Sequence, residues 1–71
     1  MKRSVTIDGH PTSISLEQEF WTELRAIADR DGVSLAALVA HIDAERWASG
    51  RPSRGLSSTL RVFVLQRLKA L

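Results

Sequence analysis

The stretch Thr12–Leu16, which leads directly into an amphipathic helix, constrains the fold more than any other part of the sequence. Ile14 and Leu16 alternate with Ser13 and Ser15. This period of two is typical of a half-buried strand, because successive side chains leave opposite faces of the backbone. A single short strand cannot satisfy its own backbone hydrogen-bonding groups. The sequence therefore predicts that residues 12–16 pair with another strand, either in the same chain or in a second copy of it.

A second alternating segment, residues 3–7, precedes this strand. The two segments are separated by Asp8-Gly9 and His10-Pro11, which are typical of tight turns. Residues 3–7 therefore form either a hairpin with residues 12–16 or a mobile basic arm, since chain termini are poorly ordered unless other contacts hold them. The sequence leaves both alternatives open.

Three helices are predicted after the strand. Residues 17–31 carry an apolar stripe at helical spacing, residues 34–46 carry a second one, and residues 57–70 carry a third. Gly32 ends the first helix and Ser34 begins the second. Residues 47–56 form a basic loop that contains glycine and proline. The apolar residues of the first two stripes are Phe20, Trp21, Leu24, Ile27 and Ala28, then Leu35, Leu38, Val39 and Ile42.

Other serines have a second interpretation as helix caps. Ser15 and Gln18 fit a capping box, so Ser15 either caps the first helix or lies on the exposed face of the strand. Ser57 or Ser58 can cap the third helix. That helix has apolar residues on more than one side, which predicts additional burial, for example against another subunit.

Charge is distributed unevenly along the 71 residues. Residues 1–45 contain all eight acidic and four basic residues, a net charge of −4, whereas residues 46–71 contain six basic residues and no acidic one, a net charge of +6. An anionic partner would therefore meet the C-terminal third or the N-terminal arm. The absence of cysteine excludes disulfides, and neither a secretory signal nor a long apolar run is present. We expect a soluble cytoplasmic protein.

No residue pattern indicates catalysis, a cofactor or a metal. His41 and Glu45 are spaced to share one helix face, but they provide two ligands where zinc sites use three or four. The serines lack the His and Asp partners that would activate a nucleophile. We therefore expect neither an enzyme nor a metal or cofactor site.

The order of these elements resembles the ribbon-helix-helix family, which includes the Arc and MetJ repressors. The resemblance rests on Thr-Ser-Ile-Ser-Leu at 12–16, on the apolar positions of the two following helices, and on the corner Gly32-Val33-Ser34 between them. With Lys-Arg-Ser-Val-Thr-Ile at the start and Leu-Ser-Ser-Thr-Leu-Arg-Val-Phe-Val near the end, the chain is similar to short bacterial members of the family that are presumed to bind DNA.

This resemblance implies a mainly α fold with a short β ribbon, in which a single domain of residues 1–71 forms an intertwined homodimer. It also implies a core shared by the two chains, made of Ile14, Leu16, Phe20, Trp21, Leu24, Leu38 and Ile42. Family members insert the ribbon into the major groove of double-stranded DNA, so that Ser13 and Ser15 would contact bases. The family also places the start of its second helix against phosphate, which implies contacts from Ser34 and from the amides of Val33 and Leu35.

Further phosphate contacts are predicted from the basic residues at the two ends of the chain, Lys2, Arg3, Arg51 and Arg54. The expected function is that of a dimeric, DNA-binding transcriptional regulator. If residues 3–7 form a hairpin, the dimer has a sheet about 14 Å wide against a groove about 12 Å wide. Either the N-terminal segment then leaves the ribbon on binding, or this surface does something else.

An alternative function is protein interaction, antitoxin-like or as an adaptor, through the apolar third helix. Membrane binding by this helix is the least favoured class, because its apolar residues are better suited to burial in protein.

Overall fold

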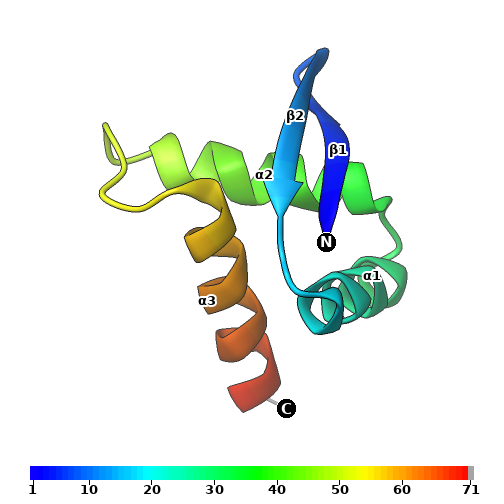
Figure 1. Ribbon diagram of the computed structural model, residues 1–71. Helices are drawn as coiled ribbons and strands as arrows, with labels where there is room; N and C mark the ends of the chain where they lie inside the picture. The colour runs from blue at the N-terminus through cyan, green and yellow to red at the C-terminus, as the bar shows by residue number, and fades with distance from the viewer. Residues whose placement is uncertain (71) are drawn as a thin grey trace.

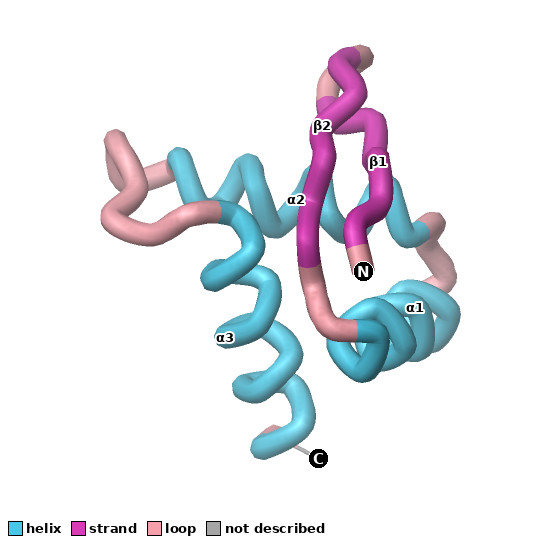
Figure 2. Tube along the Cα trace, viewed as in Figure 1, coloured by secondary structure: helices cyan, strands magenta, loops and turns pink. Residues whose placement is uncertain are grey.

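The computed structural model describes residues 1–70, and it is mainly helical with a short β ribbon, as predicted. The elements follow in the order β1 (Lys2–Ile7), β2 (His10–Ser15), α1 (Gln18–Asp31), α2 (Leu35–Trp47) and α3 (Leu56–Lys69). The hairpin rises above α2, while α1 and α3 lie below it (Figures 1 and 2). The ends of the elements agree with the predicted ranges to within two residues.

β1 and β2 form an antiparallel hairpin in which Ile7 pairs with His10 and Lys2 pairs with Ser15. The connecting residues Asp8 and Gly9 both have positive φ, 51° and 79°. This conformation suits a two-residue hairpin turn, and Asp-Gly is a favoured sequence for it. Residues 3–7 therefore belong to a strand, and the alternative of a mobile arm is wrong.

One face of the hairpin carries the apolar side chains that pack against the helices. Val5 and Ile7 of β1, Ile14 of β2 and the following Leu16 are all buried. β1 packs along α2, and β2 contacts α3. The alternation read in the sequence thus separates a buried face of the hairpin from an exposed one.

The three helices complete the core below the hairpin. Four residues of α1, three of α2 and two of α3 are buried. They are Trp21, Leu24, Ile27, Ala28, Leu38, Val39, Ile42, Leu60 and Val64. The third helix therefore packs on its own chain, through Leu60 and Val64.

The helix caps differ in part from the prediction. Ser34 caps α2, and its Oγ accepts a hydrogen bond of 3.0 Å from the amide of Ala37. The capping box of Ser15 and Gln18 is not formed, because Ser15 belongs to β2 and the N-cap of α1 is Glu17, which makes no side-chain cap bond. The N-cap of α3 is Gly55, so neither Ser57 nor Ser58 caps that helix.

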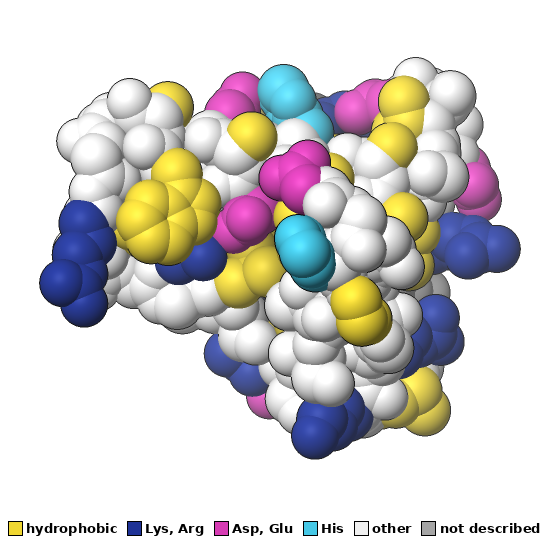
Figure 3. Space-filling model, turned by 90° about the horizontal axis from the view of Figure 1, so that it is seen from above, with side chains coloured by type: hydrophobic (Ala, Val, Ile, Leu, Met, Phe, Trp, Pro, Cys, Tyr) yellow, Lys and Arg dark blue, Asp and Glu magenta, His cyan; other side chains and the backbone are white. Residues whose placement is uncertain are grey.

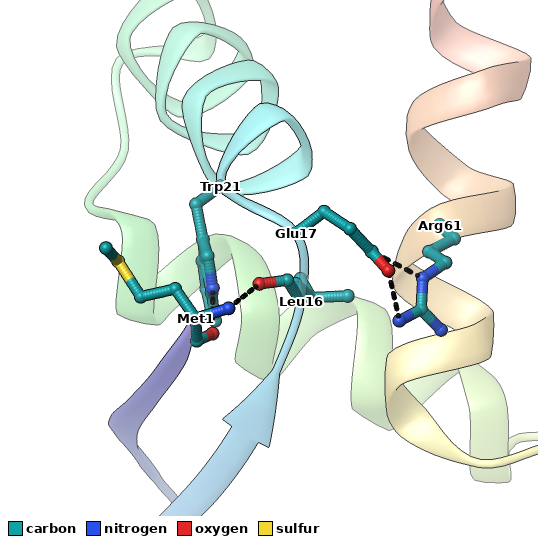
Figure 4. A network of polar contacts seen from close by, with 5 residues as sticks. All are labelled: Met1, Leu16, Glu17, Trp21 and Arg61. Carbon is teal, nitrogen blue, oxygen red and sulfur yellow. Dashed lines mark hydrogen bonds and ion pairs between the residues drawn. The ribbon is translucent and has the colours of Figure 1, made fainter.

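Polar contacts join the start of β1, the start of α1 and the middle of α3 (Figure 4). The amino group of Met1 donates to the carbonyl oxygen of Leu16, and Nε1–H of Trp21 donates to the carbonyl oxygen of Met1 at 2.9 Å. Arg61 of α3 donates to both carboxylate oxygens of Glu17, at 2.9 and 3.3 Å. These contacts hold the start of β1 and the middle of α3 against the segment that connects β2 to α1.

Candidate nucleic-acid interface

The face of the hairpin that points away from the core carries short polar side chains. The register places Ser4 opposite Ser13 and Lys2 opposite Ser15. Hydroxyl groups both donate and accept hydrogen bonds, so this face suits a polar partner with mixed donors and acceptors. We call it the hydroxyl face. Its residues, all exposed, are Lys2, Ser4 and Thr6 of β1 and Pro11, Ser13 and Ser15 of β2.

The structure brings the two predicted base-contacting residues, Ser13 and Ser15, together on this face. Ser4 and Thr6 also lie on this face. They were not among the residues predicted from the sequence, because the sequence did not decide whether residues 3–7 form a strand or a mobile arm. The signal was present in the sequence: the same alternation that marks Ser13 and Ser15 also marks Ser4 and Thr6.

The adjacent basic residues Lys2 and Arg3 lie on opposite faces of the hairpin. Lys2 is on the hydroxyl face, whereas Arg3 is paired with the buried Ile14 and shares its side. The guanidinium of Arg3 lies 5.5 Å from the centre of the Trp21 ring, within the range of a cation–π contact. Of these two predicted phosphate contacts, only Lys2 accompanies Ser13 and Ser15.

The corner between α1 and α2 has fewer free amides than the resemblance implied. The amide of Val33 donates to the carbonyl oxygen of Ala28 at 3.0 Å, because Gly32 takes a left-handed conformation with φ 72° that ends α1. The amide of Val33 is therefore not free to donate to a phosphate. Ser34 and the amide of Leu35 remain as candidates at the start of α2, where the helix dipole favours an anion.

The basic loop lies at the other end of α2, about 20 Å from that corner at ~1.5 Å per residue. Arg51 and Arg54 are exposed. Arg46 holds the loop in place, because it pairs with Asp43 at 2.9 Å and donates to the carbonyl oxygen of Arg54 at 3.0 Å. Seen from above, Lys and Arg side chains lie mainly around the edge of the molecule (Figure 3). The predicted phosphate contacts thus occupy separate regions of the surface.

The residues expected to form a core between two chains are mostly buried within one. Six of the seven, Ile14, Leu16, Trp21, Leu24, Leu38 and Ile42, have at most 5% of their surface exposed, and Phe20 is half-buried. β1 and α3 provide this cover, since both pack on the helices and strand that follow the family pattern. Burial of these side chains therefore needs no second chain.

A groove between α1 and α3 exposes apolar surface. It consists of two adjoining hollows of about 470 and 330 Å³ that share Phe20, Val64 and Leu68. Leu65 and Leu68 are 55% and 45% exposed. Glu19 and Glu23 line the α1 side of the groove. We call it the α1–α3 groove.

The described residues show neither a metal cluster nor a membrane span. Within residues 1–70, no group of three His, Cys, Asp or Glu residues could hold a metal ion. His41 instead pairs with Glu45 at 3.0 Å on the exposed side of α2. In the same part of the chain, no helix has the length and apolar character needed to cross a membrane.

Comparison with known proteins identifies one family and one similar structure. The family described as "Ribbon-helix-helix domain" matches residues 1–68. No curated protein matches the chain. Among solved structures, an uncharacterized protein from Bordetella pertussis Tohama I superposes with a TM-score of 0.82 at 36% sequence identity, over 99% of this chain and 58% of that one. The chain thus spans little more than half of the Bordetella protein.

Proposed function

Because the chain belongs to the ribbon-helix-helix family, we propose that it is a DNA-binding protein and acts as a transcriptional regulator. The observation that supports this function best is the hydroxyl face, on which Ser13 and Ser15 are exposed on the side of the hairpin opposite the core. Strands that enter a DNA groove are an established mode of binding, and serine hydroxyls can bond to base edges and phosphates.

We propose that the active form is a homodimer joined through β2. A two-stranded sheet leaves both outer edges without a strand partner, and such edges pair readily unless charges protect them. β1 carries Lys2 and Arg3 and packs along α2, whereas β2 carries no Lys, Arg, Asp or Glu. Pairing of β2 with β2 of a second copy would extend the sheet to four strands.

β1 would remain part of this sheet when DNA binds. Its side chains Val5 and Ile7 are each 7% exposed, and re-exposing two such side chains would cost roughly 3–6 kcal/mol. Trp21 also holds Met1 at the start of the strand. This argues against departure of the N-terminal segment, and we propose an arrangement that differs from both alternatives expected from the sequence, in which the intact four-stranded sheet binds DNA.

The width of a four-stranded sheet assigns different roles to its strands. With strands ~4.8 Å apart, the two β2 axes lie about 2.4 Å from the dimer axis and the two β1 axes about 7.2 Å from it. The major groove is about 12 Å wide, so its walls lie about 6 Å from the same axis. Ser13 and Ser15 would therefore face the bases, while Lys2 and Ser4 of β1 would face the phosphates of the groove walls.

Other phosphate contacts would come from the ends of α2. Ser34 and the amide of Leu35 are the candidates at its start, and Arg51 and Arg54 are those in the loop beyond its end. Such contacts position a protein on DNA without reading its sequence.

Substitution of the central serines tests the assignment of the groove face. The double variant Ser13→Ala, Ser15→Ala should lose preference for a specific duplex and largely keep its affinity for a scrambled one, measured by fluorescence anisotropy. Ser58→Ala, which removes an exposed hydroxyl of α3, is the matched control and should bind as the unmodified protein does. Equal loss of affinity for both duplexes would contradict the assignment.

A second candidate function is protein interaction, antitoxin-like or as an adaptor. It is favoured by the α1–α3 groove, where Leu65 and Leu68 are exposed beside Phe20. Large exposed apolar side chains that adjoin one another are typical of interaction sites. This function is compatible with DNA binding, because the groove and the hydroxyl face involve different side chains.

A further inference from the structure

The turn of the hairpin determines which backbone groups point to the free edge of β2. In a two-residue hairpin the residues that flank the turn, here Ile7 and His10, exchange both backbone hydrogen bonds, and every second pair after them does the same. Arg3 and Ile14 are such a pair. The bond of 3.1 Å from the amide of Leu16 to the carbonyl oxygen of Met1 continues this alternation. The intervening residues of β2 therefore direct their N–H and C=O groups away from β1.

These outward-directed residues are Pro11, Ser13 and Ser15. Proline has no N–H, so the edge at Pro11 offers only an acceptor. Ser13 and Ser15 are exposed, and in the part of the chain that the structure describes their edge-facing groups have no backbone partner. Along its free edge, β2 thus presents first Pro11, which cannot donate, and then Ser13 and Ser15, each with one free N–H donor and one free C=O acceptor.

We infer that two copies of this chain pair along β2 in one register, with Ile14 of one copy opposite Ile14 of the other. This inference rests on the homodimer proposed above and specifies its geometry. In this register Ser13 of each copy lies opposite Ser15 of the other, so that both residues use their N–H and their C=O. All edge-facing groups of the two serines are then paired.

The neighbouring registers leave groups unpaired. A register centred on Ser13 places the carbonyl of Ser15 opposite Pro11, which has no N–H to donate. A register centred on Ser15 requires Ser13 to donate to the carbonyl of Glu17, which already accepts from the amides of Phe20 and Trp21 at the start of α1. A shift by one residue would place the apolar side chains of one β2 and the hydroxyl side chains of the other on the same face of the shared sheet. Only the register centred on Ile14 avoids all three faults.

This register determines the order of side chains across the dimer sheet. On the hydroxyl face, side chains align in rows that cross the four strands. Each of the two central rows consists of Ser4 and Ser13 of one copy, then Ser15 and Lys2 of the other. Four serine hydroxyls therefore surround the dimer axis, and the two lysines lie on the same face at the two opposite outer edges of the sheet. The centre of the hydroxyl face is neutral and its two outer edges are positive.

Cysteine cross-linking tests the register directly, because the chain contains no cysteine of its own. The variants Ser13→Cys and Ser15→Cys are oxidised separately and as an equimolar mixture, and disulfide-linked dimers are resolved on a non-reducing gel. Opposite residues of a hydrogen-bonded pair have Cα atoms ~5.5 Å apart, within the range of a disulfide. Two copies of Ser13, offset by two residues, would be about 9 Å apart, beyond that range. Only the mixture should cross-link, as the mixed dimer.

Each other result overturns the inference in a distinguishable way. Cross-linking of Ser13→Cys alone would centre the register on Ser13, and cross-linking of Ser15→Cys alone would centre it on Ser15. No cross-link in a protein that light scattering shows to be dimeric would place the interface elsewhere. A folded monomer would remove the homodimer itself. Because the assay contains no DNA, none of these results depends on whether the protein binds DNA.

Discussion

Nε1–H of Trp21 donates a hydrogen bond of 2.9 Å to the carbonyl oxygen of Met1, so the first residue of the chain is fastened to the first helix. Trp21 is 1% exposed and belongs to the core. Its ring also underlies Arg3 at 5.5 Å. One residue of α1 therefore holds two positions at the start of β1, and through them the hairpin that carries the hydroxyl face.

Trp21→Phe should destabilise the protein and loosen β1. The change removes the hydrogen bond to Met1 and leaves space in the core, with an expected loss of about 1–3 kcal/mol in the free energy of unfolding. Urea denaturation measures this loss, and hydrogen exchange should be faster in residues 2–7. Trp47→Phe is the control: Trp47 is 53% exposed, so its loss should stay within about 0.5 kcal/mol. Equal losses for the two variants would contradict the anchoring role of Trp21.

Lys2→Gln should weaken DNA binding more than Arg3→Gln. Lys2 lies on the hydroxyl face, whereas Arg3 lies on the opposite face over Trp21. Each lost phosphate contact reduces the steepness with which log affinity falls against log salt by about 0.9, so loss of Lys2 from both copies should reduce that steepness by about 2. Anisotropy titrations at several salt concentrations measure the slope. An equal effect of the two substitutions would contradict DNA contact through the hydroxyl face.

Substitutions at Ser34 can separate its capping role from a phosphate contact. Asn and Asp cap helices about as well as Ser, so Ser34→Asn and Ser34→Asp should both keep the stability of the protein, whereas Ser34→Ala should lose about 1 kcal/mol. Only Ser34→Asp adds a negative charge beside the proposed phosphate, and it should weaken DNA binding several-fold relative to Ser34→Asn. If Asn and Asp bind DNA equally well, the start of α2 does not contact phosphate.

The ion pair between Glu17 and Arg61 should make stability depend on acid pH. The hydrogen bonds from Arg61 lower the pKa of Glu17 below its ordinary value of 4.5. The carboxylate is therefore stabilised by folding, so its contribution is present above pH 4.5 and is lost as the pH falls through the lowered value. Glu17→Gln should reduce the urea midpoint at pH 7 and have less effect at pH 3. An equal reduction at both pH values would exclude the charge as its cause.

Much of the fold could be predicted from local sequence signals. The alternation of Ile14 and Leu16 with serines predicts the strand, and the Asp8-Gly9 turn indicates the hairpin. The choice between strand and arm for residues 3–7 could not be made in this way. It depends on Val5 and Ile7 packing against α2 and on the bond from Trp21, and both are contacts with residues distant in the sequence.

The candidate site shows the same division between local and distant effects. Ser13 and Ser15 follow from periodicity. Once residues 2–7 are a strand, the same periodicity places Lys2 and Arg3 on opposite faces, but the hairpin register is needed to show that Lys2 lies beside Ser15. The amide of Val33 was wrongly expected to be free, because the hydrogen bond that ends α1 at Gly32 uses it. A helix-ending bond of this kind depends on backbone conformation, which residue types alone do not determine.

The measurement that tests the proposed function most directly is binding of the purified protein to duplex DNA from immediately upstream of its own gene. A scrambled duplex of the same length is the control, and both are titrated by fluorescence anisotropy across a series of salt concentrations. We predict tighter binding to the upstream duplex, with log affinity falling linearly with log salt by about 0.9 per phosphate contacted. If protein that circular dichroism shows to be folded binds neither duplex at low salt, the proposed DNA-binding function is wrong.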